Sequence, residues 1–241
     1  MTKENLWTRE ELEAYLSEMY VSLDVLSAKS GLSTDALEEL IEAGCIPGPS
    51  YEIRQREEIY AFINDDVNTL SVRTAARYFA RDTVAWLIAI KPRLDGLPLT
   101  DLSPILKAEM REAFKAGLLM HGAQEIEYES FVSTAGEINE TGLDRHFEDY
   151  IWPHWRNGTW GICVYGAHSM QNIARKTIAV NRLKKLTDNG TKPTYSVEEA
   201  RLVKAAIAEY DAIVPPFSPH DRHESSRARL VEQTLRILED S

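Results

Sequence analysis

The sequence contains few cysteines and no long hydrophobic run, and each shortage restricts what the chain can be. Its two cysteines, Cys45 and Cys163, are far apart and lack the spacing of a metal-binding motif. This usage excludes a disulfide scaffold and is typical of a protein kept in the reducing cytosol. The longest nearly apolar run, residues 83–90, is far too short to span a bilayer. The N-terminus also lacks the apolar core of a signal peptide, so we expect a soluble, cytoplasmic protein without membrane contacts.

Basic residues are fewer than acidic ones, and the formal net charge is −11 over 241 residues. Because nucleic acids and acidic membranes attract an excess of lysine and arginine, this balance argues against a general binder of either. The charge is also uneven: residues 1–62 hold 13 acidic and 5 basic side chains, whereas residues 155–230 hold 7 acidic and 12 basic ones. The contrast indicates either two domains that face each other or an anionic ligand held by the second half.

Several motifs of well-known chemistry are missing. The sequence has no glycine-rich phosphate loop, no Gly-x-Ser-x-Gly nucleophile turn and no His-Glu-x-x-His zinc motif. His220, His223 and Glu224 have spacings that can bind zinc, but a zinc site needs further ligands that no motif marks. We therefore expect no metal and no organic cofactor. This favours a condensation, elimination or rearrangement over redox chemistry.

Helix signals dominate the sequence and predict a mainly α fold. Capping boxes begin helices at residues 8–11 and 196–199, and a serine followed by a proline begins the last helix at residues 218–219. Loose alternation of apolar residues predicts one or two short strands, at residues 128–132 and 159–165.

The chain is expected to hold two domains, a small N-terminal unit at residues 1–62 and a larger helical domain at residues 67–241, joined by a linker at residues 63–66. In the second domain we expect helices at residues 70–81 and 169–186. The latter helix has basic residues on its expected outer face, where they would be solvated. They are Arg175, Lys176, Arg182, Lys184 and Lys185.

The N-terminal unit has the pattern of a helix-turn-helix. Residues 22–37 predict two short helices with a tight turn at Gly31 and an N-cap at Ser33. Residues 44–53 predict a small wing. Over residues 20–62 the sequence resembles the winged helix-turn-helix of the mercury-resistance-regulator family, which implies that fold and contact with DNA.

The helix that would enter a DNA groove, residues 33–43, has no basic residue. It carries four acidic ones instead: Asp35, Glu38, Glu39 and Glu42. Carboxylates repel the phosphates of a duplex, whose neutralisation needs lysine and arginine. We therefore favour a structural or protein-contacting role for this unit over DNA binding.

The final predicted helix gathers positive charge near its N-terminus, where free N–H groups already attract anions. Arg222, Ser226 and Arg229 lie at i, i+4 and i+7 and therefore share one helix face. His223 and Arg227 form a neighbouring row. Two guanidinium forks on one face can hold a carboxylate or a phosphate. The alternative is that these arginines pair with the protein's own acidic side chains.

Other side chains could complete such a site. His220 or His223 could act as a general acid or base, because imidazole titrates near neutral pH. Trp155 and Trp160, together with His154, could line a pocket for a planar ligand, or they could pack in the core.

Arg81 is a further candidate for binding the substrate. It lies one turn after Arg77 on the helix expected at residues 70–81, close to Tyr78 and Trp86. The alternatives are a solvated surface position and a partly buried place in the site.

Three segments together resemble an uncharacterised bacterial family of natural-product biosynthesis proteins. They are residues 78–87, 157–164 and 216–230, and the resemblance covers nearly the whole chain. It implies a setting, a bacterial gene cluster for a specialised metabolite, and it carries no catalytic residues.

We therefore expect a cytoplasmic biosynthetic enzyme, or an accessory enzyme, that acts on a small anionic metabolite. Arg222 and Arg229 would hold the anion, and His220 or His223 would move a proton. One alternative is a ligand-sensing transcription regulator. Another is an interaction module that binds a partner enzyme or a peptide, and the chain could also form a homodimer.

Overall fold

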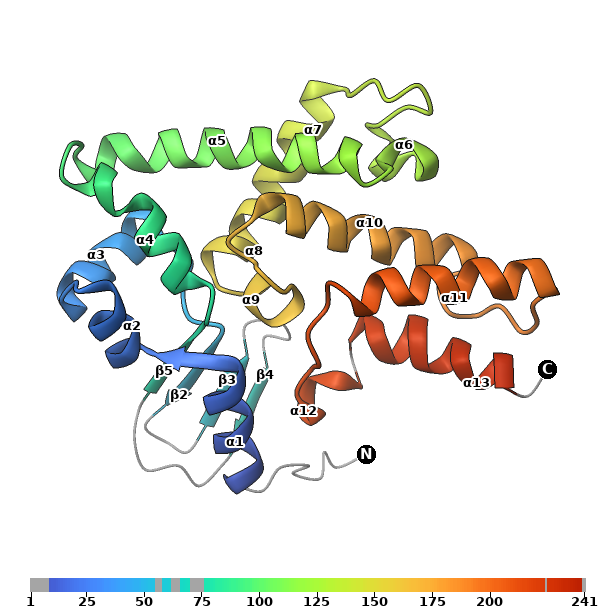
Figure 1. The fold of residues 1–241 in the computed structure, drawn as a ribbon, viewed down its shortest axis with the longest axis horizontal. Coiled ribbons are helices and arrows are strands. Elements are labelled where there is room, and N and C mark those ends of the chain that lie inside the picture. The colour runs from blue at the N-terminus through green and yellow to red at the C-terminus, as the bar shows by residue number, and fades with distance from the viewer. Residues whose placement is uncertain (1–8, 55–57, 62–65, 70–75, 224, 240–241) are drawn as a thin grey trace. The chain divides into compact units, whose positions relative to one another are not determined.

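The computed structural model describes residues 9–54, 58–61, 66–69, 76–223 and 225–239. Within them the chain is mainly α with a few short strands, as predicted (Figure 1). The elements in chain order are α1 (Arg9–Met19), β1 (Tyr20–Ser22), α2 (Leu23–Ser30), α3 (Thr34–Ala43), β2 (Tyr51–Arg54), β3 (Glu58–Ala61), β4 (Asp66–Thr69), β5 (Ala76–Ala80), α4 (Thr83–Leu94), α5 (Leu99–Met120), α6 (Ala123–Ile126), α7 (Glu140–His146), α8 (Trp152–Arg156), α9 (Trp160–Cys163), α10 (Met170–Leu186), α11 (Val197–Asp211), α12 (Pro219–Arg222) and α13 (Gln233–Glu239).

The chain divides into two compact units, and each is discontinuous in sequence. Unit 1 comprises residues 1–112 and 147–169, and unit 2 comprises residues 113–146 and 170–241. The linker predicted at residues 63–66 lies almost wholly outside the described residues. The strands β3 and β4 on its two sides pair with each other in one sheet of unit 1. The boundaries of the two units therefore differ from those of the two domains that the sequence predicts.

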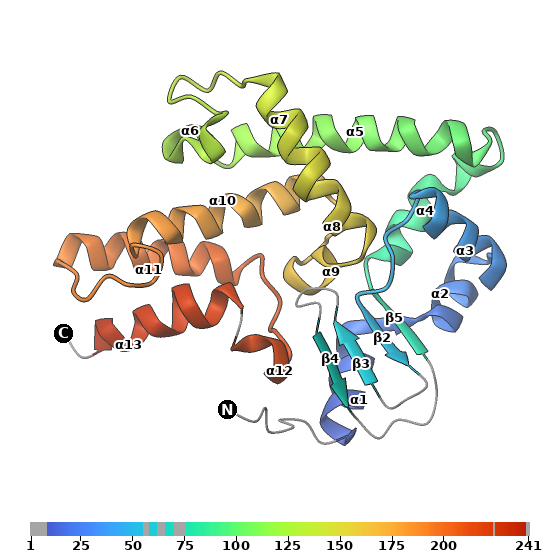
Figure 2. The ribbon, with the colours of Figure 1, turned by 180° about the vertical axis from the view of Figure 1, so that it is seen from behind.

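The described strands of unit 1 form one antiparallel sheet in the order β1-β5-β2-β3-β4, and the view from behind shows β5, β2, β3 and β4 side by side (Figure 2). β5 pairs on both edges, with Tyr20 opposite Ala80 and Tyr51 opposite Tyr78. The helix predicted at residues 70–81 is therefore wrong over residues 76–80. Aromatic residues favour strands, and the side chain of Phe79 in β5 is fully buried.

The helix pair of unit 1 begins and ends where the sequence indicates. Ser22 and Ser33 are N-caps, and their side chains accept hydrogen bonds from the N–H groups of Val25 and Ala36. Gly31 ends α2 in the left-handed conformation, with φ of 71°. The two helices pack with β5 and α4 over a core of buried apolar residues. This core contains Val21, Leu26, Leu37, Leu40, Cys45, Ile46, Phe79, Leu87, Ile90, Leu102 and Leu106.

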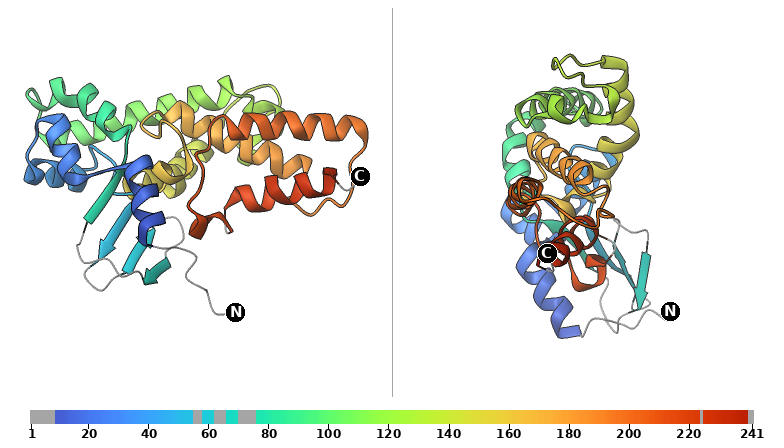
Figure 3. Two further views of the ribbon diagram at one scale, coloured as in Figure 1. Left: turned by 60° about the horizontal axis from the view of Figure 1, so that its bottom comes forward. Right: turned by 90° about the vertical axis from the view of Figure 1, so that its right-hand side faces the viewer.

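Unit 2 is built around α10, which contacts both α6 and α11 (Figure 3 shows α10 and α11 alongside each other). The capping box at the start of α11 is confirmed, since Ser196 and Glu199 each bond the backbone of the other. Gly117 of α5 lets that helix approach α10 closely. A Cβ atom at Gly117 would lie 2.8 Å from the Cβ of Ala174 and 2.9 Å from the Cα of Gln171.

The two short strands predicted late in the chain are not strands. Residues 160–163 form the helical turn α9, which follows Gly158 with φ of 81°. The side chain of Asn157 accepts bonds from both the N–H and the hydroxyl of Thr159, and this fixes a turn before α9. Residues 128–130 form a 3₁₀ turn, and beyond it a single bridge joins Val132 to Ile138.

The last helix of the chain is not continuous. α12 is one turn long, a π-helical segment spans Arg227–Glu232, and α13 follows. The sequence predicts one regular helix in which Arg222, Ser226 and Arg229 share a face. That face does not form, because the turn after α12 and the wider π-helical spacing both change the angle between successive side chains.

Candidate functional site

The predicted arginine clamp is occupied by the protein's own acids. Ser218 caps α12 as expected, since its hydroxyl accepts from the Asp221 N–H at 3.0 Å. Arg222 Nε donates to Glu232 Oε1 at 2.7 Å, and Arg227 Nε lies 3.8 Å from the same oxygen. Arg227 also donates to Asp211 Oδ1 at 2.6 Å. Two of the three arginines are therefore in ion pairs, which is the alternative that the sequence left open.

The remaining residues of the predicted clamp have separate surroundings. Ser226 shares a 2.8 Å hydrogen bond with the hydroxyl of the buried Tyr210. Arg229 is exposed, and its side chain has no hydrogen bond or ion pair with the described residues. His223 is also exposed, and the side chain of His220 lies outside the described part of the chain. None of these residues lines either of the two cavities described below.

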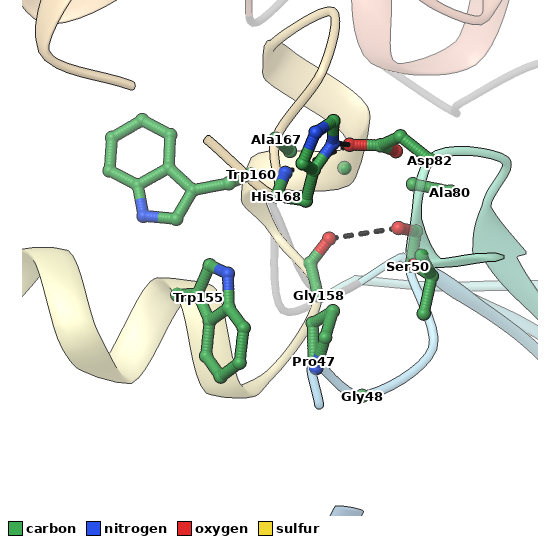
Figure 4. A pocket seen from close by; sticks show the side chains of 12 residues that line it. Pro47, Gly48, Ser50, Ala80, Asp82, Trp155, Gly158, Trp160, Ala167 and His168 are labelled. Carbon is green, nitrogen blue, oxygen red and sulfur yellow. Dashed lines mark hydrogen bonds and ion pairs between the residues drawn. The ribbon is translucent and has the colours of Figure 1, made fainter. Parts of the chain in front are cut away.

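Trp155 and Trp160 line a small cavity in unit 1, and both are buried in the core (Figure 4). Trp155 stacks on Trp152 with ring centroids 5.2 Å apart, and Trp160 Nε1 donates to the Ile151 carbonyl at 3.0 Å. The cavity has a volume of about 10 Å³. Such a space admits one water molecule and no metabolite. His154 lies outside it, with Nδ1 2.6 Å from the carbonyl of Tyr150.

The same cavity contains a histidine–aspartate pair that the sequence did not reveal. Asp82 Oδ2 accepts from the His168 backbone N–H at 2.8 Å and lies 2.9 Å from His168 Nδ1. The hydrogen bond with Asp82 and its negative charge raise the pKa of His168, against the opposing effect of burial. Asp82 is also the residue that precedes α4. It stands at the capping position but makes no capping bond, because its carboxylate binds His168.

Arg81 and Arg77 are also tied to neighbouring groups. The strand β5 replaces the helix on which they were expected to share a face. Arg81 Nη2 donates to the Ser17 carbonyl. Both terminal guanidinium nitrogens of Arg77, Nη1 and Nη2, donate to the carboxylate of Glu38 on α3. These bonds give both arginines a structural role.

A much larger cavity lies in unit 2, with a volume of about 430 Å³ (its helices are labelled in Figure 1). Its walls come from the end of α5 and from α6, α10 and α11. We call it the unit 2 cavity. Its lining residues are Leu119, Met120, His121, Gly122, Gln124, Glu125, Arg175, Ile178, Ala179, Arg182 and Glu209.

Arg182 holds one side of the unit 2 cavity together. It donates to Glu125 Oε2 at 2.9 Å, to Glu209 Oε2 at 2.5 Å and to the His121 carbonyl at 3.3 Å. Gly122 makes room for this network. A Cβ atom there would lie 2.9 Å from Glu125 Oε1 and 3.0 Å from Arg182 Nη2, and the φ of 85° also favours glycine. The charge of Arg182 is therefore opposed by two carboxylates.

Arg175 and His121 differ from Arg182, because neither makes a side-chain hydrogen bond or ion pair with the described residues. Both are half-buried. Burial lowers the pKa of His121, the charges of Arg175 and Arg182 lower it further, and Glu209 acts in the opposite direction. Gln124 Oε1 is buried and lacks a hydrogen-bond partner in the structure. The unit 2 cavity thus offers a cation without an ion-pair partner among the described residues, an imidazole held neutral and an amide oxygen that accepts no hydrogen bond from them.

The sequence could not single out these residues. Arg175 and Arg182 were assigned to the solvated outer face of a helix, and in the structure both are partly covered and line the cavity. His121 stands at the end of α5 with no motif around it. The described residues contain no group of three or more histidine, cysteine, aspartate or glutamate side chains that could hold a metal ion. In the same residues, no helix combines the length and hydrophobicity needed to cross a bilayer.

Residues 107–239 match the model of a family of unknown function, DUF6058. The match begins within α5 and reaches the end of α13, so it includes every residue that lines the unit 2 cavity. No curated protein and no solved structure matches the chain.

Proposed function

Since the matched segment is more than half of the chain, the protein belongs to DUF6058, and we propose that it binds a small anionic metabolite in the unit 2 cavity. The observation that carries this proposal is the guanidinium of Arg175, which is partly withdrawn from water and has no acidic partner among the described residues. A charge in that position is costly unless something neutralises it. A carboxylate or phosphate would do so through paired hydrogen bonds.

The dimensions and lining of the unit 2 cavity support a small ligand. Its volume of about 430 Å³ falls within the range of roughly 300–1,000 Å³ that small-molecule sites occupy. Leu119, Met120 and Ile178 supply apolar wall, so the ligand carries an apolar portion beside its anionic group. Gln124 Oε1 accepts a hydrogen bond from a donor on the ligand.

His121 gives the cavity a group that can move a proton. Its lowered pKa keeps the imidazole of the empty cavity neutral near pH 7, so that the ring can take up a proton and pass it to a bound substrate. We place this chemistry in bacterial specialised metabolism, as the resemblance to natural-product biosynthesis proteins implies. The reaction would be a condensation, elimination or rearrangement that needs no cofactor, in a biosynthetic or accessory enzyme.

The proposal predicts a large effect of Arg175→Gln on ligand affinity. Loss of a hydrogen-bonded charge pair weakens binding by about 1.5–3 kcal/mol, which is roughly 10–100-fold. Arg201→Gln is the matched control, because Arg201 is exposed on α11, pairs with Glu198 and lies outside the cavity. Isothermal titration calorimetry measures the affinity of both variants for sulfate and for intermediates made by the enzymes that neighbouring genes encode. Equal affinity of Arg175→Gln and the parent protein would exclude the proposed site.

A second candidate function is protein interaction through α3. Asp35, Glu39 and Glu42 are exposed on this helix, whereas Glu38 is engaged by Arg77. Three free carboxylates on one short helix suit a basic partner surface better than a DNA groove. Salt-sensitive co-purification with a partner enzyme, lost when the three are changed to their amides, would support this function.

A further inference from the structure

The position of His121 suggests that its protonation is coupled to the content of the unit 2 cavity. His121 directly follows α5, where its N–H bonds the Gly117 carbonyl at 3.1 Å and its carbonyl accepts from Arg182. Both backbone groups are therefore engaged. The imidazole is half-buried and has no hydrogen bond or ion pair with the described residues.

Charged side chains line the cavity from α6, α10 and α11, whereas α5 contributes Leu119 and Met120. Arg175 and Arg182 lie on α10, Glu209 on α11 and Glu125 on α6. Both carboxylates are bonded to Arg182, and their two negative charges exceed its single positive one, so the four charges sum to zero. Arg175 itself forms no ion pair with the described residues. In the empty cavity, a proton on His121 would add a second positive charge beside it.

An anion bound to Arg175 changes this balance. It neutralises the charge that opposes protonation and places a negative charge near the ring, and a negative neighbour within about 4–6 Å favours the protonated imidazole. The imidazolium then donates a hydrogen bond to the anion, which strengthens binding.

We infer that an oxyanion enters the unit 2 cavity together with one proton, which His121 takes up. The ligand class is a carboxylate, sulfate or phosphate group, and the inference rests on the proposed function. Binding is then stronger in acid than in base, and the affinity reports the pH of the surroundings.

The direction of the pH dependence follows from linkage. At a pH below the pKa of His121 in the empty protein, the ring is protonated in both states and affinity is constant at its highest value. Between the pKa values of the empty and occupied protein, affinity falls about tenfold per pH unit. Above the higher pKa the ring is neutral in both states, and affinity is constant at its lowest value.

Sulfate is a suitable probe, because it stays doubly charged throughout the range and contributes no protons of its own. Calorimetric titration of the full chain at about pH 5.5 and about pH 8.0 should show roughly tenfold tighter binding in acid. Titrations near pH 6.5 in two buffers of unlike ionisation enthalpy should show net proton uptake. In His121→Gln, affinity should be the same at both pH values and equal to that of the parent protein at the higher one.

His168→Gln is the matched control, since it removes a titrating histidine of unit 1 that lies outside the unit 2 cavity. This variant should keep the full pH dependence. Absence of sulfate binding at either pH would overturn the proposed function and this inference together. Sulfate binding without proton uptake, or a pH dependence that survives in His121→Gln, would overturn the inference alone.

Discussion

Asp82 stands at the N-cap position of α4, but its carboxylate is hydrogen-bonded to His168, which lies 86 positions further along the chain. By contrast, Ser33 and Ser196 cap their helices as expected, because capping depends only on the next few residues. Caps could therefore be predicted from sequence. The Asp82–His168 pair, and an Arg175 without an ion-pair partner among the described residues, could not, because both depend on which distant segments the fold brings together.

The Asp82–His168 pair predicts a pH-dependent contribution to stability. Its hydrogen bond raises the pKa of His168 in the folded state, so the contribution is complete below the ordinary value of about 6.5. It is lost as pH rises through the folded-state pKa. His168 is 36% exposed, so the effect should not exceed about 1 kcal/mol.

Urea unfolding of the parent protein and His168→Gln at about pH 5.5 and about pH 8.5 measures this contribution. The difference in unfolding free energy between the two proteins should be larger at the acidic pH. A difference that is equal at both pH values, or larger in base, would contradict the prediction.

At the scale of elements, pairing partners decide between helix and strand. Residues 76–80 read as a helix in sequence, but β1 and β2 offer hydrogen-bonding edges on both sides, and the segment is a strand. Residues 159–165 read as a strand, but no such edge adjoins them among the described residues, and α9 forms instead. Helices α2, α3 and α11 were predicted because both of their signals, capping and apolar spacing, are local. The sheet was missed because its edges are not.

Close packing of α5 on α10 predicts the effect of Gly117→Ala. Alanine favours helix over glycine by about 1 kcal/mol, so a free helix would gain stability. Here the new methyl group would lie 2.8 Å from the Cβ of Ala174, and overpacking of this kind costs about 1–3 kcal/mol. We expect net destabilisation, and lower affinity for the ligand of the unit 2 cavity, whose walls these helices form.

Gly96→Ala is the comparison for this variant, because the new Cβ would lie at an ordinary contact distance, 3.9 Å, from the Arg93 carbonyl oxygen. Thermal unfolding should leave Gly96→Ala close to the parent protein and lower the midpoint of Gly117→Ala. A Gly117→Ala protein as stable as Gly96→Ala would show that α5 can move away from α10 at little cost.

At the scale of the whole molecule, the excess of acidic residues argues against DNA binding. The chain carries a net charge of −11, and α3, the helix that would read DNA, exposes Asp35, Glu39 and Glu42. The two predicted helices and the tight turn at Gly31 are present in the structure, and the second helix has no basic residue. Composition alone predicted this, since counting acidic residues needs no fold.

The charge of the molecule predicts that it does not bind duplex DNA. Phosphate contacts by lysine and arginine supply most of non-specific affinity, and α3 offers none. Fluorescence anisotropy with labelled duplex from the flanking promoter, at about 50 mM salt, should show no complex at micromolar protein. A salt-sensitive complex would favour the transcription-regulator alternative.

Glu232 determines the charge around Arg222 and Arg227 on the surface of unit 2. One of its oxygens serves both Arg222 and Arg227, and it is the partner that the structure gives to Arg222. Replacing this one carboxylate by an amide would remove the negative charge beside both guanidinium groups, while Asp211 would stay paired with Arg227. A single point mutation therefore separates the present surface from one that could capture phosphate-bearing molecules, which makes position 232 a ready starting point for directed evolution.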